Sequence, residues 1–341
     1  MMRSISLLAL TLCSACFFNQ GYPEMHTVRI SSEAVNFTEI NSIYDDFNMG
    51  QYQFYNDYLL VFSSNRNSQG QDFDLVTQNV RIEVDRERAT YEIIVNPTEF
   101  YGYDTTEIAQ LVDLTRNTCD QLGPQLMTQS YTLNAFDYID WAALFYAENC
   151  DGHFDIVWKA QEAGRLISSF ALSQLNTESD DLYPTIVTDS SIYFCSNRNG
   201  TFDIFSYEFG GSLTPKRAEE LADRLMADTL GTAVQQAISS DRNDKCPHFV
   251  RTVFNDYLIF ASDRAGGFGG FDLYYSLLKN GVWQQPINFG PEVNSPHDDY
   301  RPIVIPIDGL ENNMMVFSSN RPGGLGGYDL YYAGVELGPM F

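Results

Sequence analysis

Short apolar strands in this sequence recur in pairs, with a polar or glycine-rich loop between the two members of each pair. The first members end at Phe62-Ser63-Ser64-Asn65-Arg66, Tyr146-Ala147-Glu148-Asn149-Cys150, Phe194-Cys195-Ser196-Asn197-Arg198, Phe260-Ala261-Ser262-Asp263-Arg264 and Phe317-Ser318-Ser319-Asn320-Arg321. The second members begin at Phe73-Asp74-Leu75, Phe154-Asp155-Ile156, Phe202-Asp203-Ile204, Phe271-Asp272-Leu273 and Tyr328-Asp329-Leu330. Two such strands joined by a loop of this composition predict a β-hairpin, so we expect five similar hairpins.

The spacing of these hairpins predicts their arrangement. The aspartates that open the second strands lie at positions 74, 155, 203, 272 and 329, in steps of 81, 48, 69 and 57 residues. A four-stranded propeller blade takes roughly 40 to 50 residues, so each step fits one blade with or without an insertion. The sequence therefore predicts an all-β fold, a five-bladed β-propeller.

A second repeat indicates how the propeller closes. Residues 287–295 read Ile-Asn-Phe-Gly-Pro-Glu-Val-Asn-Ser and follow the fourth hairpin, while residues 35–42 read Val-Asn-Phe-Thr-Glu-Ile-Asn-Ser. The fifth hairpin has almost no chain left after Tyr332 for an outer strand of its own. We therefore expect residues 33–40 to supply that strand, which would leave the ring without an open edge.

Two stretches do not read as blade strands, and we expect helical insertions at about 97–128 and about 210–242. In the first, Asp104 and Glu107 form a capping pair before an amphipathic run of Ile108, Leu111, Val112, Thr115, Cys119 and Leu122, with Gly123 as its end. In the second, Thr214 is the expected cap and Pro215 the first turn, followed by apolar Ala218, Leu221, Ala222 and Leu225. Packing on the propeller and docking of a partner are both compatible with these helices.

The N-terminus has the features of a secretory signal. Arg3 precedes the short apolar run of residues 5–12, which ends in Cys13-Ser14-Ala15-Cys16 and is too short to span a bilayer. The segment resembles a bacterial lipoprotein signal that is cleaved after Ala15 and leaves Cys16 as the lipid-modified residue. Ordinary secretion with cleavage elsewhere is the alternative. The predicted organisation is a signal peptide over 1–15, a tether over 16–32 and one propeller domain over 33–341.

The net charge of the chain limits the classes of molecule that it can bind. The 341 residues include 20 Lys or Arg and 45 Asp or Glu, which gives a net charge of −25. A surface this acidic repels phosphate backbones, so we expect no nucleic acid as a partner. The chain is also 44% hydrophobic, which excludes a disordered protein.

The repeat resembles a known family. The Ser-Asn-Arg loop, the strand around Gly266 to Tyr274 and the segment from Trp283 to Gly290 are similar to TolB-type WD-like propeller repeats, as found in Bacteroidetes envelope lipoproteins. This resemblance implies an outer-membrane lipoprotein of a Gram-negative bacterium, anchored through Cys16. It also implies a non-catalytic scaffold that binds another envelope protein through its propeller. Residues 17–21 lack the acidic residues that resemble surface-export tethers in this bacterial group, which favours the periplasmic face.

Residues that recur in every hairpin are predicted to be structural. Repetition argues that the loop arginines and the strand aspartates form an ion pair or a capping hydrogen bond that orders each turn. This set consists of Arg66, Asp74, Asp155, Arg198, Asp203, Arg264, Asp272, Arg321 and Asp329. A catalytic role would require one copy to differ from the others.

Enzymatic and metal-binding motifs are missing from the sequence. It contains no Gly-x-Ser-x-Gly, His-Glu-x-x-His or Walker pattern, and its four histidines are scattered, so we predict no catalytic, cofactor or metal-binding residues. The alternative function is a carbohydrate-binding or glycoside-hydrolysing propeller, because five-bladed propellers elsewhere carry Asp and Glu pairs for this purpose. The sequence does not decide whether paired acidic residues bind calcium.

The disulfide pairing is also open. Four cysteines allow three connectivities, and the cysteines concerned are Cys119, Cys150, Cys195 and Cys246.

Overall fold

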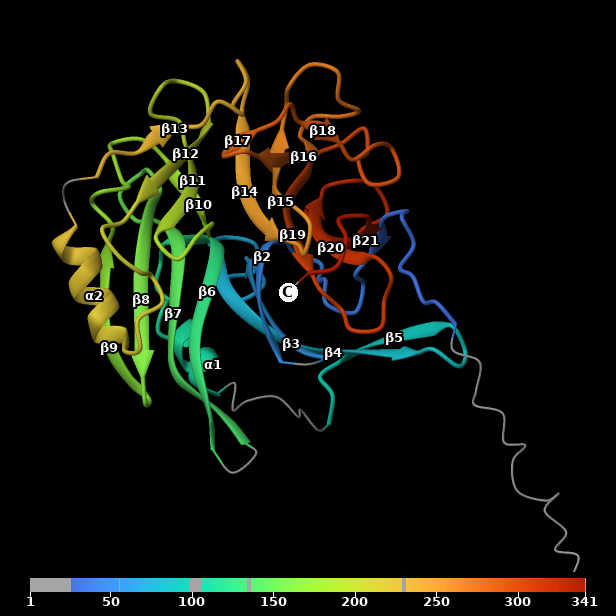
Figure 1. The fold of residues 1–341 in the computed structure, drawn as a ribbon, viewed down its shortest axis with the longest axis horizontal. Helices are drawn as coiled ribbons and strands as arrows, with labels where there is room; N and C mark the ends of the chain where they lie inside the picture. Colours follow the sequence, from blue (N-terminus) through green and yellow to red (C-terminus); the bar gives the residue numbers. More distant parts are fainter. Residues whose placement is uncertain (1–25, 55, 99–105, 134–135, 229–230, 341) are drawn as a thin grey trace, which may run out of the picture.

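Five antiparallel sheets surround a central axis in the computed structural model (Figure 1). The structure describes residues 26–54, 56–98, 106–133, 136–228 and 231–340. The innermost strand of each sheet contacts the innermost strands of its two neighbours, and these five strands form a closed ring. The prediction of an all-β five-bladed propeller is confirmed.

The strands of each blade follow one another from the axis outward. Blade 1 consists of β2 (Asp46–Phe54), β3 (Asp57–Ser64), β4 (Asp74–Asp85) and β5 (Thr90–Val95). Blade 2 consists of β6 (Asp120–Leu133), β7 (Phe136–Asn149), β8 (Asp155–Glu162) and β9 (Arg165–Ala171). Blade 3 consists of β10 (Asp181–Ile186), β11 (Ser191–Ser196), β12 (Asp203–Glu208) and β13 (Val234–Gln235). Blade 4 consists of β14 (Asp244–Arg251), β15 (Asp256–Ser262) and β16 (Asp272–Lys279), with β17 (Val282–Trp283) and β18 (Ile287–Asn288) both paired to β16. Blade 5 consists of β19 (Asp299–Ile305), β20 (Asn313–Ser319), β21 (Asp329–Val335) and β1 (Val35–Asn36).

The N-terminal strand closes the ring, as the repeat predicts. Val35 pairs with Tyr332 in antiparallel register, and Phe37 donates its backbone N–H to the carbonyl of Leu330 at 2.9 Å. The Phe37 ring is 1% exposed and packs edge-on against the Tyr332 ring. The first and last strands of the propeller are thus held in one sheet.

The segment just before β1 also belongs to the packed structure. Val28 forms a parallel bridge with Leu310, and the side chains of Val28 and Ile30 are buried. Residues 26–32, which the sequence suggests as part of a tether, therefore lie against blade 5. The predicted signal peptide and Cys16 lie outside the described residues, so the lipid anchor and the envelope location stay predictions. None of the helices among the described residues is long and apolar enough to cross a membrane.

The two predicted helices exist, but both are shorter than the sequence suggests. Helix α1 spans Thr106–Asp113 and buries Ile108, Leu111 and Val112 against blades 1 and 2. It was expected to continue to Gly123, but β6 begins at Asp120. The reason is that Asp120 accepts the backbone N–H of Phe73, a contact between blades that requires an extended chain at this point. The expected cap residue Asp104 lies outside the described residues.

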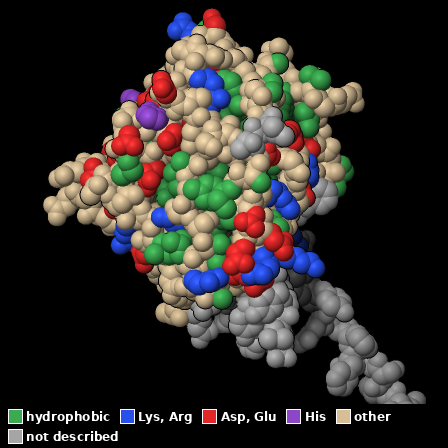
Figure 2. All heavy atoms as spheres, turned by 90° about the vertical axis from the view of Figure 1, so that its left-hand side faces the viewer, with side chains coloured by type: hydrophobic (Ala, Val, Ile, Leu, Met, Phe, Trp, Pro, Cys, Tyr) green, Lys and Arg blue, Asp and Glu red, His purple; other side chains and the backbone are tan. Residues whose placement is uncertain are grey.

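Helix α2 spans Ala218–Ala227 and begins four residues after the predicted cap. The Thr214 hydroxyl donates instead to the Asp189 carboxylate at 2.5 Å, so it does not cap the helix. The predicted apolar face is buried against blades 2 and 3. An ion pair between Arg165 of β9 and Glu219 of α2 adds to this packing. The side of the molecule that carries α2 and β9 shows hydrophobic side chains between charged ones (Figure 2).

Candidate functional site

The recurring loop arginines pair with aspartates on the innermost strands. In each of four blades one Arg Nη2 lies 2.5 or 2.6 Å from a carboxylate oxygen of an Asp whose side chain is fully buried. These pairs are Arg66–Asp46, Arg198–Asp181, Arg264–Asp244 and Arg321–Asp299. Each arginine also donates to a backbone carbonyl of the segment that enters the blade, namely that of Ile40, Leu175, Ile238 or Val293. The arginine therefore fixes the hairpin loop to the start of the innermost strand.

The aspartates that open the third strands have a different role from the arginines. Asp272 accepts backbone N–H groups from Phe268 and Gly269, and Asp329 accepts those of Leu325 and Gly326. These two aspartates order the long hairpin loops of blades 4 and 5. Asp74 opens β4 in the same position of blade 1.

Asp155 and Asp203 lack these loop donors. Their hairpin loops are three residues shorter, and each has one carboxylate oxygen, Oδ1, that finds no hydrogen-bond partner among the described residues. Burial raises the pKa of Asp155, and the neighbouring Asp181 raises it further while His153 lowers it. Burial and the neighbouring Asp244 raise the pKa of Asp203. These two carboxyl groups hold a proton more readily than an ordinary aspartate does.

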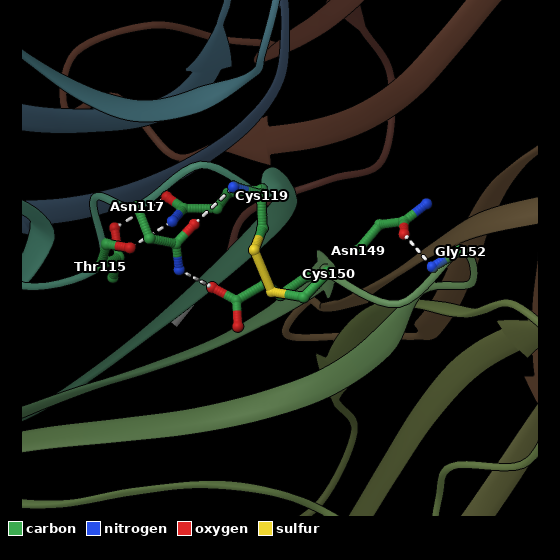
Figure 3. Close-up of a disulfide and its surroundings, with 8 residues drawn as sticks. Thr115, Asn117, Cys119, Asn149, Cys150 and Gly152 are labelled. Carbon is green, nitrogen blue, oxygen red and sulfur yellow. Dashed lines mark hydrogen bonds between the residues drawn. A yellow bond between two sulfur atoms is a disulfide. The ribbon is translucent and has the colours of Figure 1, made fainter.

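Blade 2 replaces the arginine pair with a disulfide. Cys150 stands at the arginine position, and its sulfur is bonded to that of Cys119, just before β6 (Figure 3). Gln121 takes the place of the buried aspartate. Beside the disulfide, Asn117 donates to Glu148 at 2.6 Å and accepts the Cys119 N–H at 2.7 Å. Of the three connectivities the sequence left open, the structure has Cys119 with Cys150, and Cys195 and Cys246 are buried free thiols.

The innermost strands all bulge toward the axis at the same position. The residue two positions after the buried aspartate, or after Gln121 in blade 2, has a positive φ in every blade and interrupts the pairing register. These residues are Asn48, Gly123, Tyr183, Cys246 and Arg301. A β-bulge changes the direction in which a side chain points, and here it directs one residue of each blade toward the axis.

Tyr183 closes the axis. Its hydroxyl accepts from the Asn48 amide at 3.5 Å, and the Arg301 guanidinium lies 5.4 Å from its ring centre, so blades 1, 3 and 5 meet at this side chain. Blade 2 also meets it, because a Cβ on Gly123 would lie 2.4 Å from a Tyr183 ring carbon. At φ +62°, only glycine satisfies both the conformation and the close approach. Burial raises the pKa of the Tyr183 phenol, which therefore stays neutral.

Arg301 is a buried cation on this axis without a carboxylate partner. Its side chain is 2% exposed, and its Nη2 donates to the carbonyl of Pro124 at 3.3 Å. Nε and Nη1 find no partner within the part of the chain that the structure describes. No carboxylate among the residues that the structure describes forms a salt bridge with this guanidinium, and an unpaired buried charge is costly.

Five half-buried aromatic side chains surround the axis on the face that carries the hairpin loops. They are the residues directly before the third strands, Phe73, Phe154, Phe202, Phe271 and Tyr328, and we call them the axial aromatic cluster. The residue after the buried aspartate, or after Gln121 in blade 2, lies next to this cluster, and in blades 1 and 4 it inserts between two of its rings. Phe47, for example, lies 4.8 Å from the Phe73 ring and 5.7 Å from the Tyr328 ring. Leu122, Leu182, Lys245 and Tyr300 occupy this position in the other blades.

The backbone of every member of the axial aromatic cluster is clamped by the next blade. Its carbonyl accepts the N–H of the residue that occupies the buried-aspartate position, at 2.7 to 2.8 Å. Its N–H donates to a side-chain oxygen of the residue just before, at 2.7 to 3.1 Å. Those acceptors are Asp45, Asp120, Asp180, Asn243 and Asp298. The backbone that carries each of these aromatic side chains is thus fixed by the neighbouring blade.

Lys245 is the one charged side chain inserted between members of the axial aromatic cluster. Its Nζ lies 3.7 Å from the Phe202 ring centre and 5.7 Å from that of Phe271. It forms no ion pair within the described ranges of the chain, whereas its neighbour Asp244 is paired with Arg264. The described residues contain no group of three or more His, Cys, Asp and Glu that could hold a metal ion.

The sequence analysis did not identify this site. The residues predicted from the repeat are its Arg and Asp residues, not its aromatic ones. The aromatic before each strand aspartate recurs in all five copies, and that recurrence was the available indication.

Comparison with known proteins supports the fold and corrects the predicted family. No family model matches the chain, and no curated protein does. Among solved structures, the chain is similar to a thermostable family-43 glycoside hydrolase, with a TM-score of 0.52, 11% identity, and coverage of 93% of this chain and 99% of the other. It is equally similar to an α-L-arabinofuranosidase from Podospora anserina in complex with cellotriose, with a TM-score of 0.52, 11% identity, and coverage of 92% and 99%.

These matches overturn two predictions. The resemblance to TolB-type repeats is wrong as an assignment, because the similar structures are glycoside hydrolases and no family model supports it. The prediction of a non-catalytic, protein-binding scaffold is wrong for the same reason. The similarity between these structures and this chain is one of fold.

Proposed function

We propose that this chain is a carbohydrate-active propeller that takes a saccharide at the axial aromatic cluster. The observation that carries the proposal is the cluster itself, with five half-buried aromatic side chains around one axis. Sugar rings present C–H faces that pack on aromatic surfaces, and sites for small molecules combine such surfaces with a few polar groups. Lys245 and the Tyr328 hydroxyl, which donates to Asp298 at 3.0 Å, are polar groups at the cluster.

The similar solved structures support the same class of ligand. Both match nearly the full length of this chain, and they are a family-43 glycoside hydrolase and an α-L-arabinofuranosidase in complex with cellotriose. Arabinofuranosides and cello-oligosaccharides are therefore the first saccharides to test.

Hydrolysis of a glycosidic bond requires a carboxyl group that is protonated near neutral pH. Asp155 and Asp203 are the described carboxyl groups whose pKa is raised, and each follows a member of the axial aromatic cluster directly in sequence. We propose them as the candidate proton donors.

The test measures saccharide binding and hydrolysis separately. Calorimetry with arabino- and cello-oligosaccharides should give binding that Phe202→Ala and Phe154→Ala weaken by roughly fivefold or more, since each removes a stacking surface. Phe254→Ala is the matched control, because Phe254 is 75% exposed and lies outside the cluster. Asp155→Asn or Asp203→Asn should lower turnover by about 100-fold or more without weakening binding. The absence of binding to any saccharide, or equal loss in all three phenylalanine variants, would refute the proposal.

A further inference from the structure

The charges at the axis point to a particular kind of saccharide. Lys245 and Arg301 come from neighbouring innermost strands, β14 and β19, and neither has a carboxylate partner in the described part of the chain. Both cations are close enough to the buried Cys195 and Cys246 thiols to act on them electrostatically. In a chain with a net charge of −25, the described residues thus contain a positive centre without a paired carboxylate.

One blade departs from the repeat next to Lys245. In blades 3 and 5 a carboxylate on the residue that enters the innermost strand accepts from a loop amide, as Asp180 does from Asn197 and Asp298 from Asn320. In blade 4 the two side chains are exchanged, and the Asn243 amide donates to the Asp263 carboxylate at 2.9 Å. The same hydrogen bond forms, but the negative charge moves from the residue two before Lys245 to the hairpin loop.

This exchange has an electrostatic consequence rather than a structural one. Asn243 still accepts the Phe202 N–H, at 3.1 Å, so the clamp on the aromatic residue is retained. The carboxylate adjacent in sequence, Asp244, is neutralised by Arg264 at 2.6 Å. Lys245 is therefore left without a carboxylate on the strand segment that carries it.

We propose that the saccharide is anionic, and that its carboxylate binds Lys245 while its ring packs against the axial aromatic cluster beside this lysine. The inference rests on the proposed function and specifies its ligand as an oligosaccharide that contains a uronic acid. Arg301, deeper on the axis, adds to the positive potential without contacting the ligand.

The acidic surface does not prevent such binding. Exposed charges are screened over roughly 8 Å at about 0.15 M ionic strength, whereas a contact with a half-buried ammonium is screened much less. A hydrogen bond to a charged group contributes about 1.5 to 3 kcal/mol, which corresponds to a preference of roughly tenfold or more.

The experiment compares uronate oligosaccharides with their carboxyl-reduced forms, which keep the same linkages and lose only the charge. Calorimetry on the full chain should show the acidic form binding at least tenfold more tightly. Lys245→Met keeps much of the apolar stem and should bring the ratio of the two affinities close to one. Lys279→Met, at an exposed position of β16, should leave the ratio unchanged.

An exchange variant tests the argument from the repeat. Asn243→Asp combined with Asp263→Asn restores the arrangement of blades 3 and 5 at constant net charge, and should lower the preference for the acidic form several-fold. Competition by millimolar acetate would identify a site for any small carboxylate, and would overturn the assignment to a saccharide. Equal binding of the acidic and reduced forms would overturn the inference and leave the proposed function standing. If neither the acidic nor the reduced form binds, both this inference and the proposed function are wrong.

Discussion

Cys150 occupies the position at which the other four hairpins carry an arginine, and its disulfide bond to Cys119 replaces the ion pair that the arginine forms in those blades. In both arrangements the hairpin loop is fixed to the entry of the innermost strand. The disulfide links residues 31 apart in sequence and removes the conformational freedom of that loop from the unfolded chain.

We expect reduction of this disulfide to lower the free energy of unfolding by about 3 to 4 kcal/mol. The double variant Cys119→Ser, Cys150→Ser should have the same stability with and without dithiothreitol, and should match the reduced wild-type protein. Urea denaturation followed by circular dichroism measures both. If dithiothreitol leaves the wild-type midpoint unchanged, the disulfide does not contribute as described.

Removal of one arginine from a buried ion pair should lower the free energy of unfolding substantially. Arg321→Ala leaves the fully buried Asp299 carboxylate without its cation, so we expect a loss of about 3 to 5 kcal/mol in unfolding free energy. The control is Arg88→Ala, which breaks an exposed pair with Asp85 and should cost less than about 1 kcal/mol. Similar losses in the two variants would contradict the role given to the buried pair.

Protonation of His248 should destabilise the fold. Burial, and to a smaller extent the Arg301 charge, lower the pKa of His248 to about 3, and its Nε2 accepts the Val304 N–H at 3.1 Å. The unfolded chain takes up this proton near pH 6.5, so stability should fall as the pH decreases from about 6.5 toward 3, by up to about 1.4 kcal/mol per unit.

The comparison with His248→Gln isolates this effect. Between pH 6.5 and 5, where few carboxylates titrate, the wild-type unfolding free energy should decrease and that of the variant should stay nearly constant. Parallel curves for the two proteins would show that His248 does not titrate in the way its burial predicts.

Closure of the ring should depend on Phe37. Phe37→Ala removes a ring that is 1% exposed and should lower the unfolding free energy by about 3 to 5 kcal/mol. Hydrogen exchange should also become faster at the β21 amides, because β1 is their partner strand. Val35→Ala, at a residue that is 37% exposed, should change neither measurement appreciably. Unchanged exchange in β21 of the Phe37 variant would argue against this closure.

The sequence was sufficient for the architecture because the architecture is repetitive. Five copies of one hairpin establish the blades, and the likeness of residues 35–42 to 287–295 predicts the closing strand. Local sequence patterns gave wrong predictions at positions where contacts between blades determine the secondary structure. The run from Ile108 to Leu122 is amphipathic as a helix, yet the helix ends at Asp113 and the last three residues of the run belong to β6, where Asp120 has a partner in blade 1.

The site depends on contacts that no single repeat contains. Arg66 precedes Asp74 closely in sequence but pairs with Asp46, twenty residues earlier, because the loop folds back over its own innermost strand. Lys245 lies against Phe202 of the preceding blade, which only the assembled ring brings together. Aligning the five innermost strands would have shown Lys245 and the Asn243 exchange as departures from the pattern.

The seal that Tyr183 makes over Gly123 governs how a polymer can approach. Residues of blades 1, 2 and 5 all contact the Tyr183 side chain of blade 3, so this side chain obstructs the axis of the ring. For the saccharide proposed above, this geometry predicts entry and exit on the same face of the propeller. The proposed site would then accept a chain terminus or a side branch rather than a polysaccharide threaded along the axis.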